Sequence, residues 1–167
     1  MPRRLTSLLV IVLTASSVAP AGFAGSTVAP APGPHFALPA VTGLVDSDSL
    51  RGRIVLVDFW ASWCGPCRQS FPWMAAMHDK YATRGLVIVA INLDKDRAAA
   101  DKFLATFRVP FAVAFDPAGK TAEAFHVGAM PSSVLLGRSG EMLYTHTGFD
   151  PKRSGAFEAK LEEACSR

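Results

Sequence analysis

The stretch from Ile54 to Cys67 reads IVLVDFWASWCGPC, an apolar run that leads directly into two cysteines. A run of this length and composition is typical of a strand that is buried on both faces of a sheet. Residues 86–93 form a second run of the same kind. Between the two, from about residue 66 to residue 84, apolar side chains recur at helical spacing: Phe71, Met74, Met77 and Tyr81. These patterns predict a strand–helix–strand unit with the cysteines at its first junction.

The remaining patterns predict an α/β three-layer sandwich. Strands alternate with helices along the chain, and a hairpin and a terminal helix follow, which is typical of a sheet covered by helices. The expected elements are a strand or hairpin over 36–45, a helix over 96–107, a strand over 111–115, a helix over 121–126, a hairpin of 133–136 with 142–146, and a helix over 151–164.

The two cysteines form a C-x-x-C pair at the expected start of a helix. Free backbone N–H groups and the helix dipole stabilise a thiolate at Cys64 there, and the thiolate is the form that attacks a disulfide. Cys67 lies one helical turn further on and can attack Cys64 in turn, which releases a bound substrate. Gly65 and Pro66 make the turn and begin the helix, where the missing N–H of proline has no partner to lose. The motif therefore predicts thiol–disulfide exchange.

Three other uses of a C-x-x-C pair fit the sequence less well. The pair is half of a tetrahedral zinc site, but the chain has no second C-x-x-C, and its four histidines form no H-x₃₋₅-H pair. A purely structural disulfide would close too short a loop to constrain the unfolded chain much. Haem attachment requires a histidine directly after the second cysteine, where Arg68 stands. We expect neither a metal nor another cofactor.

Residues 1–24 have the pattern of a secretory signal peptide. Arg3 and Arg4 precede an apolar run over residues 5–18, and small residues follow it at 19–24. Cleavage is expected, because the apolar run is shorter than the roughly 20 residues that a membrane span needs. An uncleaved membrane anchor is the alternative. Residues 25–34, rich in Ala, Pro, Gly and Ser, are expected to form a flexible spacer, and residues 35–167 the folded domain.

The charge balance of the chain argues against a nucleic-acid partner. The chain has 17 basic and 14 acidic residues, and two of the basic ones are the arginines of the signal. No basic block of the kind that binds phosphate backbones is present. We therefore expect no nucleic-acid partner.

Residues 57–67 resemble the active-site stretch of thioredoxin, and the rest of the chain resembles the exported TlpA/ResA-like branch of the thioredoxin superfamily, which includes cytochrome c maturation reductases. The likeness to that branch spans about residues 35–165. It is carried by FALP at 36–39, LRGR at 50–53, an inserted helix and strand at about 96–115, and GAMPS at 128–132. It implies a thioredoxin-like three-layer sandwich, with a central mixed sheet, helices on both faces and that helix–strand insert.

The resemblance also implies roles for single residues. Cys64 would be the nucleophile and Cys67 the resolving thiol. Pro131 would follow a cis peptide bond and face the disulfide, and the backbone of Met130 would pair with a bound substrate chain. The residues expected to contact substrate are Trp63, Gly65, Pro66, Met130 and Pro131.

Asp58 matches the buried acid of thioredoxin, and its setting agrees with that role. It is a lone carboxylate inside an apolar run, so burial should raise its pKa and let it exchange a proton with Cys67. A strand-end aspartate that reaches solvent is the alternative. Thioredoxin has a lysine near its acid, and the matching position here is Ala90, so no such lysine is expected to tune Asp58.

Three further residues have more than one interpretation. Trp60 and Trp63 are expected to cover the active-site face, with aromatic core as the alternative. Cys165, near the end of the last helix, fits a free thiol, an intermolecular link or a buried inert cysteine.

The leading functional hypothesis is an enzyme that reduces protein disulfides in the periplasm, with cytochrome c maturation as one setting. The resemblance implies that a membrane donor supplies its electrons. We expect the protein to be a monomer. The alternatives are an oxidant that donates disulfides to folding proteins, a non-catalytic binding module with a thioredoxin fold, and a peroxidase, which would need a different context around Cys64.

Overall fold

A computed structural model of the chain describes residues 31–107 and 109–167. The signal peptide expected over residues 1–24 and most of the spacer expected over 25–34 lie outside these residues. The last part of that spacer is described. The backbone N–H of Gly33 donates to the carbonyl of Gly140, and the N–H of Met142 donates to the carbonyl of Ala31, each at 2.8 Å. The boundary at residue 35 stays a prediction.

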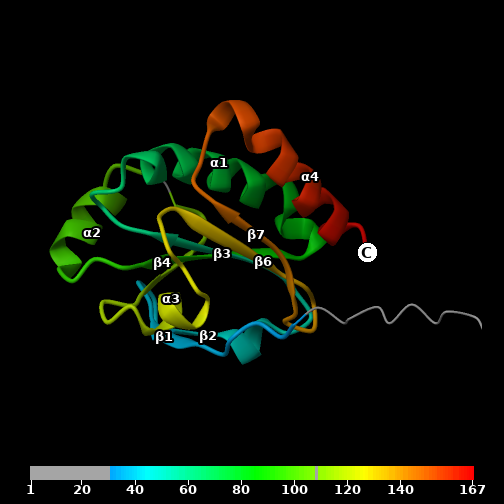
Figure 1. The fold of residues 1–167 in the computed structure, drawn as a ribbon, viewed down its shortest axis with the longest axis horizontal. Helices are drawn as coiled ribbons and strands as arrows, with labels where there is room; N and C mark the ends of the chain where they lie inside the picture. The colour runs from blue at the N-terminus through cyan, green and yellow to red at the C-terminus, as the bar shows by residue number, and fades with distance from the viewer. Residues whose placement is uncertain (1–30, 108) are drawn as a thin grey trace, which may run out of the picture.

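Five strands form a central mixed sheet in the order β5-β4-β3-β6-β7 (Figure 1). Strands β3, β4 and β5 run parallel to one another, while β6 is antiparallel to both β3 and β7. Their bounds are β3 Ile54–Trp60, β4 Leu86–Asn92, β5 Ala112–Phe115, β6 Ser132–Leu136 and β7 Met142–Thr147. A separate hairpin is formed by β1 (Ala37–Pro39) and β2 (Leu44–Asp46). Both expected hairpins are therefore confirmed.

Helices cover both faces of this sheet, as Figure 1 shows. Helix α1 (Gly65–Tyr81) lies on one face with α4 (Ser154–Cys165), and α2 (Arg97–Leu104) packs beside α1 through Phe103. Helix α3 (Lys120–Ala124) lies on the other face together with the β1–β2 hairpin. The expected three-layer sandwich is confirmed, and the expected helix–strand insert is α2 with β5. None of the helices within residues 31–107 and 109–167 is long and apolar enough to cross a bilayer.

Three helices are shorter than their patterns predict because 3-10 helices or tight turns replace their ends. Helix α1 gives way to a short 3-10 helix at residues 82–84, which ends at Gly85 with a φ of 93°. Helix α2 ends at Leu104, after which the hydroxyl of Thr106 bonds the carbonyl of Phe103. The last helix is preceded by a 3-10 turn at residues 151–153. Left-handed glycines and 3-10 turns are usual where helices end.

The alternation of side chains along β3 divides the core into two clusters. Ile54, Leu56 and Trp60 pack against the helices α1, α2 and α4, while the three residues between them pack on the α3 face: Val55, Val57 and Phe59. Because side chains of a strand alternate between faces, Asp58 lies on the α1 face, on the same side as the cysteines.

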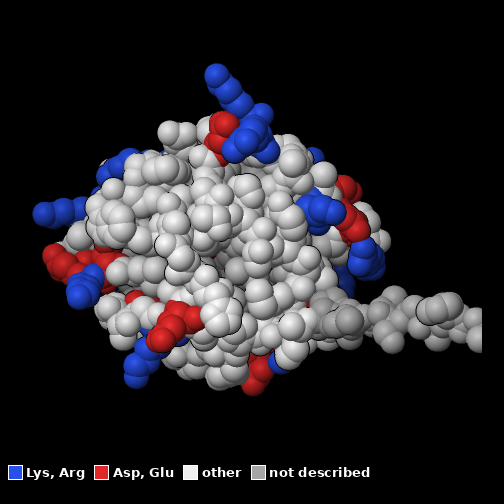
Figure 2. Space-filling view, viewed as in Figure 1, with Lys and Arg blue, Asp and Glu red and all other residues white. Residues whose placement is uncertain are grey.

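Charged side chains lie around the edge of the face drawn in Figure 2, and the middle of that face carries few. Two ion pairs tie the end of α1 and the 3-10 helix after it to α4: Lys80 with Glu158 at 2.6 Å and Arg84 with Glu162 at 2.7 Å. Because water screens ion pairs at the surface, these two pairs contribute little to stability. The packing of α4 therefore rests mainly on its buried apolar residues.

Candidate active site

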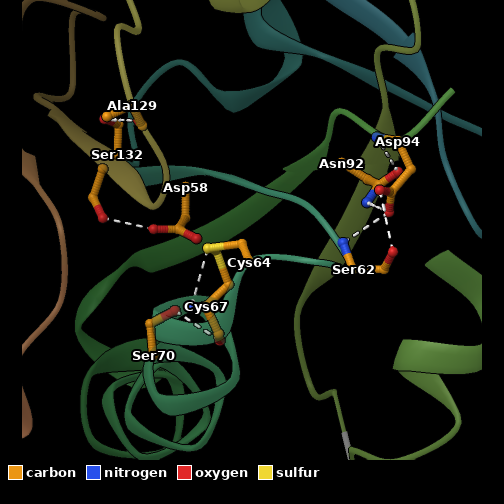
Figure 3. Close-up of a disulfide and its surroundings, with 10 residues drawn as sticks. Asp58, Ser62, Cys64, Cys67, Ser70, Asn92, Asp94, Ala129 and Ser132 are labelled. Carbon is orange, nitrogen blue, oxygen red and sulfur yellow. Dashed lines mark hydrogen bonds between the residues drawn. A yellow bond between two sulfur atoms is a disulfide. The ribbon is translucent and has the colours of Figure 1, made fainter. Parts of the chain in front are cut away.

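The two cysteines lie at the N-terminus of α1 and are joined by a disulfide (Figure 3). Cys64 is the N-cap residue, and its sulfur accepts a hydrogen bond from the backbone N–H of Cys67 at 3.3 Å. Gly65 and Pro66 occupy the first turn, as expected. The same N–H groups would stabilise a Cys64 thiolate once the disulfide is reduced.

The two sulfur-bearing residues differ in their access to solvent. Cys64 keeps an exposed fraction of 4%, whereas Cys67 is fully buried at 0%. An incoming disulfide therefore meets Cys64 first, which supports its expected role as the nucleophile. Cys67 is left as the buried partner that would resolve a mixed disulfide.

Asp58 is buried on the α1 face, with an exposed fraction of 1%. Its strand position pairs with Ala90 of β4 on one side and with Ser133 of β6 on the other. The Ser133 hydroxyl donates to Oδ1 of Asp58 at 2.6 Å, and Oδ2 has no partner among the described residues. Burial raises the pKa of this carboxyl to about 7, although the hydrogen bond from Ser133 acts to lower it. Figure 3 shows the carboxyl pointing toward the disulfide.

The loop before β6 has the expected cis peptide bond between Met130 and Pro131, so that prediction is confirmed. The Ser132 hydroxyl bonds the carbonyl of Ala129 at 2.7 Å, and the N–H of Gly148 bonds the carbonyl of Pro131 at 2.7 Å. Met130 packs against the apolar cluster that contains both cysteines. Substrate contacts by Met130 and Pro131 stay a prediction.

The two tryptophans before the cysteines have different environments. Trp63 is 72% exposed beside the disulfide. Trp60 is fully buried and packs edge-on against Phe71, with ring centroids 4.8 Å apart, and against Phe103 at 4.7 Å. Trp60 is therefore an aromatic core residue, which was the alternative interpretation, because it is the last residue of β3 that faces α1. The expectation that it covers the active-site face is wrong.

Sequence reasoning missed a polar network that holds the turn before Cys64. Asp94 is buried and accepts hydrogen bonds from the backbone N–H of Ser62 at 2.9 Å and from the Ser62 hydroxyl at 3.2 Å. The Asn92 amide donates to the same carboxylate at 2.8 Å (Figure 3). The network ties the turn to the end of β4. Its signal in the sequence is an Asn-x-Asp at the end of an apolar run.

A groove of about 530 Å³ opens beside the first turn of α1. It lies between Pro66 and the connection from β7 to α4, and it is lined by residues 146–150 together with Arg153 and Phe157. No motif in the sequence marks this connection. The groove is lined by both apolar and polar residues, and Pro66 of the C-G-P-C sequence forms part of its wall.

Possible metal ligands gather elsewhere among the described residues. His35, Asp46 and Asp48 lie close together near the β1–β2 hairpin, and the His35 ring is 3.2 Å from the Asp46 carboxylate. Pairing of a histidine with exposed carboxylates accounts for this group. The hairpin lies on the face of the sheet opposite α1, so the group is separate from the disulfide.

The sequence model of the family described as Redoxin matches residues 29–162. The chain belongs to the redoxin family. The thiol-disulfide oxidoreductase ResA of Bacillus subtilis (strain 168) is 30% identical over 116 residues, which are 69% of this redoxin and 65% of that protein. The chain thus spans just under two thirds of that curated relative.

Solved structures agree with the thioredoxin-like fold of this redoxin. A proposed thiol:disulfide interchange protein DsbE from Chlorobium tepidum is 47% identical, with a TM-score of 0.80, and the match covers 81% of this chain and 96% of that one. A thiol:disulfide interchange protein of the thioredoxin family from Chlorobium tepidum TLS is 26% identical, with a TM-score of 0.71 and coverage of 81% and 97%.

Proposed function

We propose that this redoxin is a thiol–disulfide oxidoreductase that reduces protein disulfides in the periplasm. The observation that carries the proposal is the Cys64–Cys67 disulfide at the N-terminus of α1, with the buried Asp58 on the same face of the sheet. The names of the ResA and DsbE relatives describe the same class of reaction.

The reaction begins from the reduced pair. The Cys64 thiolate attacks one sulfur of a substrate disulfide, which forms a mixed disulfide and expels the other substrate sulfur as a thiolate that takes up a proton. Asp58 then accepts the proton of Cys67, and the Cys67 thiolate attacks the sulfur of Cys64. This step expels the second substrate sulfur, to which the proton is returned. The substrate gains two electrons and two protons, and Cys64 and Cys67 become the disulfide.

The substrate chain would lie across the surface around the disulfide. Trp63 offers an exposed aromatic face, and the groove beside Pro66 offers room for a side chain that flanks the substrate cysteine. The backbone of Met130 would pair with the substrate. Pro131 in the same loop and Gly65 in the first turn of α1 would lie beside the bound segment. This arrangement favours an extended protein segment over a small molecule.

Regeneration of the dithiol needs a reductant, since the reaction leaves the protein oxidised. In an oxidising compartment that reductant would be a membrane donor of electrons. The resemblance to the TlpA/ResA-like branch supports this donor and cytochrome c maturation as a setting. Action as a monomer stays an expectation.

Export depends on the signal expected over residues 1–24. We expect the signal to be removed, because its apolar run is too short to span a membrane comfortably. N-terminal sequencing of the exported protein should begin between Gly22 and Ser26. A membrane fraction that carries an intact Met1 would indicate the anchored form instead.

The direction of electron flow is tested by the reduction potential. The C-G-P-C sequence is that of thioredoxin, whose potential is about −270 mV, against about −120 mV for a strong periplasmic oxidant. We expect a single two-electron couple below about −200 mV, and cleavage of insulin disulfides by the reduced protein.

Two results would change the assignment. A potential near −120 mV would make the protein a donor of disulfides. Full function of a variant with both Cys64 and Cys67 replaced by serine would make it a binding module.

A further inference from the structure

The two oxygens of the Asp58 carboxyl have different surroundings. Oδ1 accepts the Ser133 hydroxyl at 2.6 Å, whereas Oδ2 is buried and has no partner among the described residues. Buried polar atoms nearly always have a partner, so an orphan of this kind calls for an explanation. Figure 3 shows the second oxygen on the side of the disulfide.

Asp58 shares its face of the sheet with apolar residues and with the cysteine pair. Its strand neighbours on the same face are Leu56 and Trp60, and the paired position on β4 is Ala90. Helix α1 contributes the cysteine pair on this face. No ion pair reaches Asp58 from any described residue. The hydrogen bond from Ser133 is therefore its one polar contact within the described part of the chain.

One further ionisable side chain lies in the same cross-strand row. His146 of β7 pairs with Ser133, which pairs with Asp58. His146 packs on Phe157, with ring centroids 5.3 Å apart, and lines the groove beside Pro66. A substitution at His146 therefore serves as a control for the assignment of the carboxyl signal to Asp58.

We infer that Ser133 is the positioning residue for Asp58, and that its hydroxyl bond to Oδ1 leaves Oδ2 as the oxygen that exchanges a proton with Cys67. The inference rests on the proposed function for the identity of the reaction. A donated hydrogen bond occupies Oδ1, so a proton that leaves the Cys67 thiol goes to the free Oδ2. The proton returns from Oδ2 to the departing substrate thiolate, and the carboxylate is restored.

The hydroxyl of Ser133 also stabilises the ionised form of the acid that it holds. In the parent, burial and this bond act in opposite directions on the same carboxyl. Removal of the bond leaves burial unopposed. Fewer molecules would then carry the carboxylate at neutral pH, and release from the mixed disulfide would slow there.

The test compares Ser133→Ala with its parent in two measurements. The first follows the titration of Asp58 in the oxidised protein through its carboxyl signal, assigned with Asp58→Asn. We expect Ser133→Ala to raise the midpoint by about one pH unit. The second follows release of a model substrate from the Cys64 mixed disulfide. We expect release to slow about fivefold at pH 7 and about tenfold at pH 6, and to match the parent above pH 9, as a one-unit change implies.

Three variants serve as matched controls. Ser133→Thr keeps a hydroxyl on the strand and should restore the parental midpoint. Ser132→Ala removes a hydroxyl that bonds the Ala129 carbonyl on the other face of β6, and it should leave the midpoint where it is. His146→Gln should also leave it in place, which assigns the titration to Asp58.

An unmoved midpoint in Ser133→Ala overturns the inference, as does a Ser133→Thr variant that shifts as far as Ser133→Ala. Slowing of release by the same factor at every pH would also overturn it, because a purely structural role predicts that result. The titration needs no substrate. A parent that fails to reduce insulin would therefore refute the proposed function, while a raised midpoint would still support the control of Asp58 by Ser133.

Discussion

Replacement of Cys67 by serine is expected to produce a protein that forms a stable mixed disulfide with its substrate. Cys64 is the partly accessible sulfur at the N-cap of α1, and Cys67 is fully buried behind it. With serine at position 67, the first attack proceeds and the second has no nucleophile. The mixed disulfide should accumulate and be visible on non-reducing gels, and mass spectrometry of the trapped complexes would identify the substrates. Turnover should fall by on the order of 10³-fold or more.

The matched variants of the other cysteines make this result specific. Cys64→Ser should trap nothing and should lose turnover as completely. Cys165 is free and buried in α4, so Cys165→Ser should keep the parental turnover. Equal trapping by Cys64→Ser and Cys67→Ser, or trapping through Cys165, would contradict the assigned roles.

Replacement of Asp58 by asparagine is expected to stabilise the oxidised protein at neutral and alkaline pH. The folded-state pKa of Asp58 is about 7, against 3.8 for a free aspartate. Between these two values the folded protein holds a proton that the unfolded chain has released, so the free energy of unfolding falls as pH rises and is level again above pH 7. A difference of about 3 pKa units corresponds to roughly 4 kcal/mol. Asp58→Asn removes this loss of unfolding free energy, because asparagine does not titrate.

Denaturant unfolding of both oxidised proteins at intervals from pH 4 to pH 8 measures the effect. The two free energies of unfolding should diverge steadily between pH 4 and pH 7, with the variant more stable at pH 8. Parallel curves would show that Asp58 does not titrate in this range.

The same substitution should slow disulfide exchange near neutral pH, on the order of 10²-fold, because Cys67 loses its proton acceptor. The substitution would thus separate stability from activity. Exchange kinetics unchanged across pH 5–9 would reject the role of Asp58 in proton transfer.

The sequence by itself determined the fold and the reactive pair. A run of six apolar or aromatic residues and one acid, rich in β-branched side chains, is typical of a strand inside a covered sheet, and β3 is buried along its whole length. The C-x-x-C pair with a proline between its cysteines predicts a helix start, and Cys64 is the N-cap of α1. Both conclusions follow from residues close together in the chain, where spacing alone decides which groups meet.

Only the tertiary structure decided which distant groups complete the site. Ser133 is 75 residues from Asp58 and meets it because the antiparallel register of β3 and β6 sets the two opposite each other. A one-residue change of that register would turn the serine to the other face. Asp94 reaches Ser62 across 32 residues for a similar reason, since the ends of β3 and β4 lie side by side. Strand register and the facing of side chains depend on how the whole sheet packs, and the local pattern does not contain them.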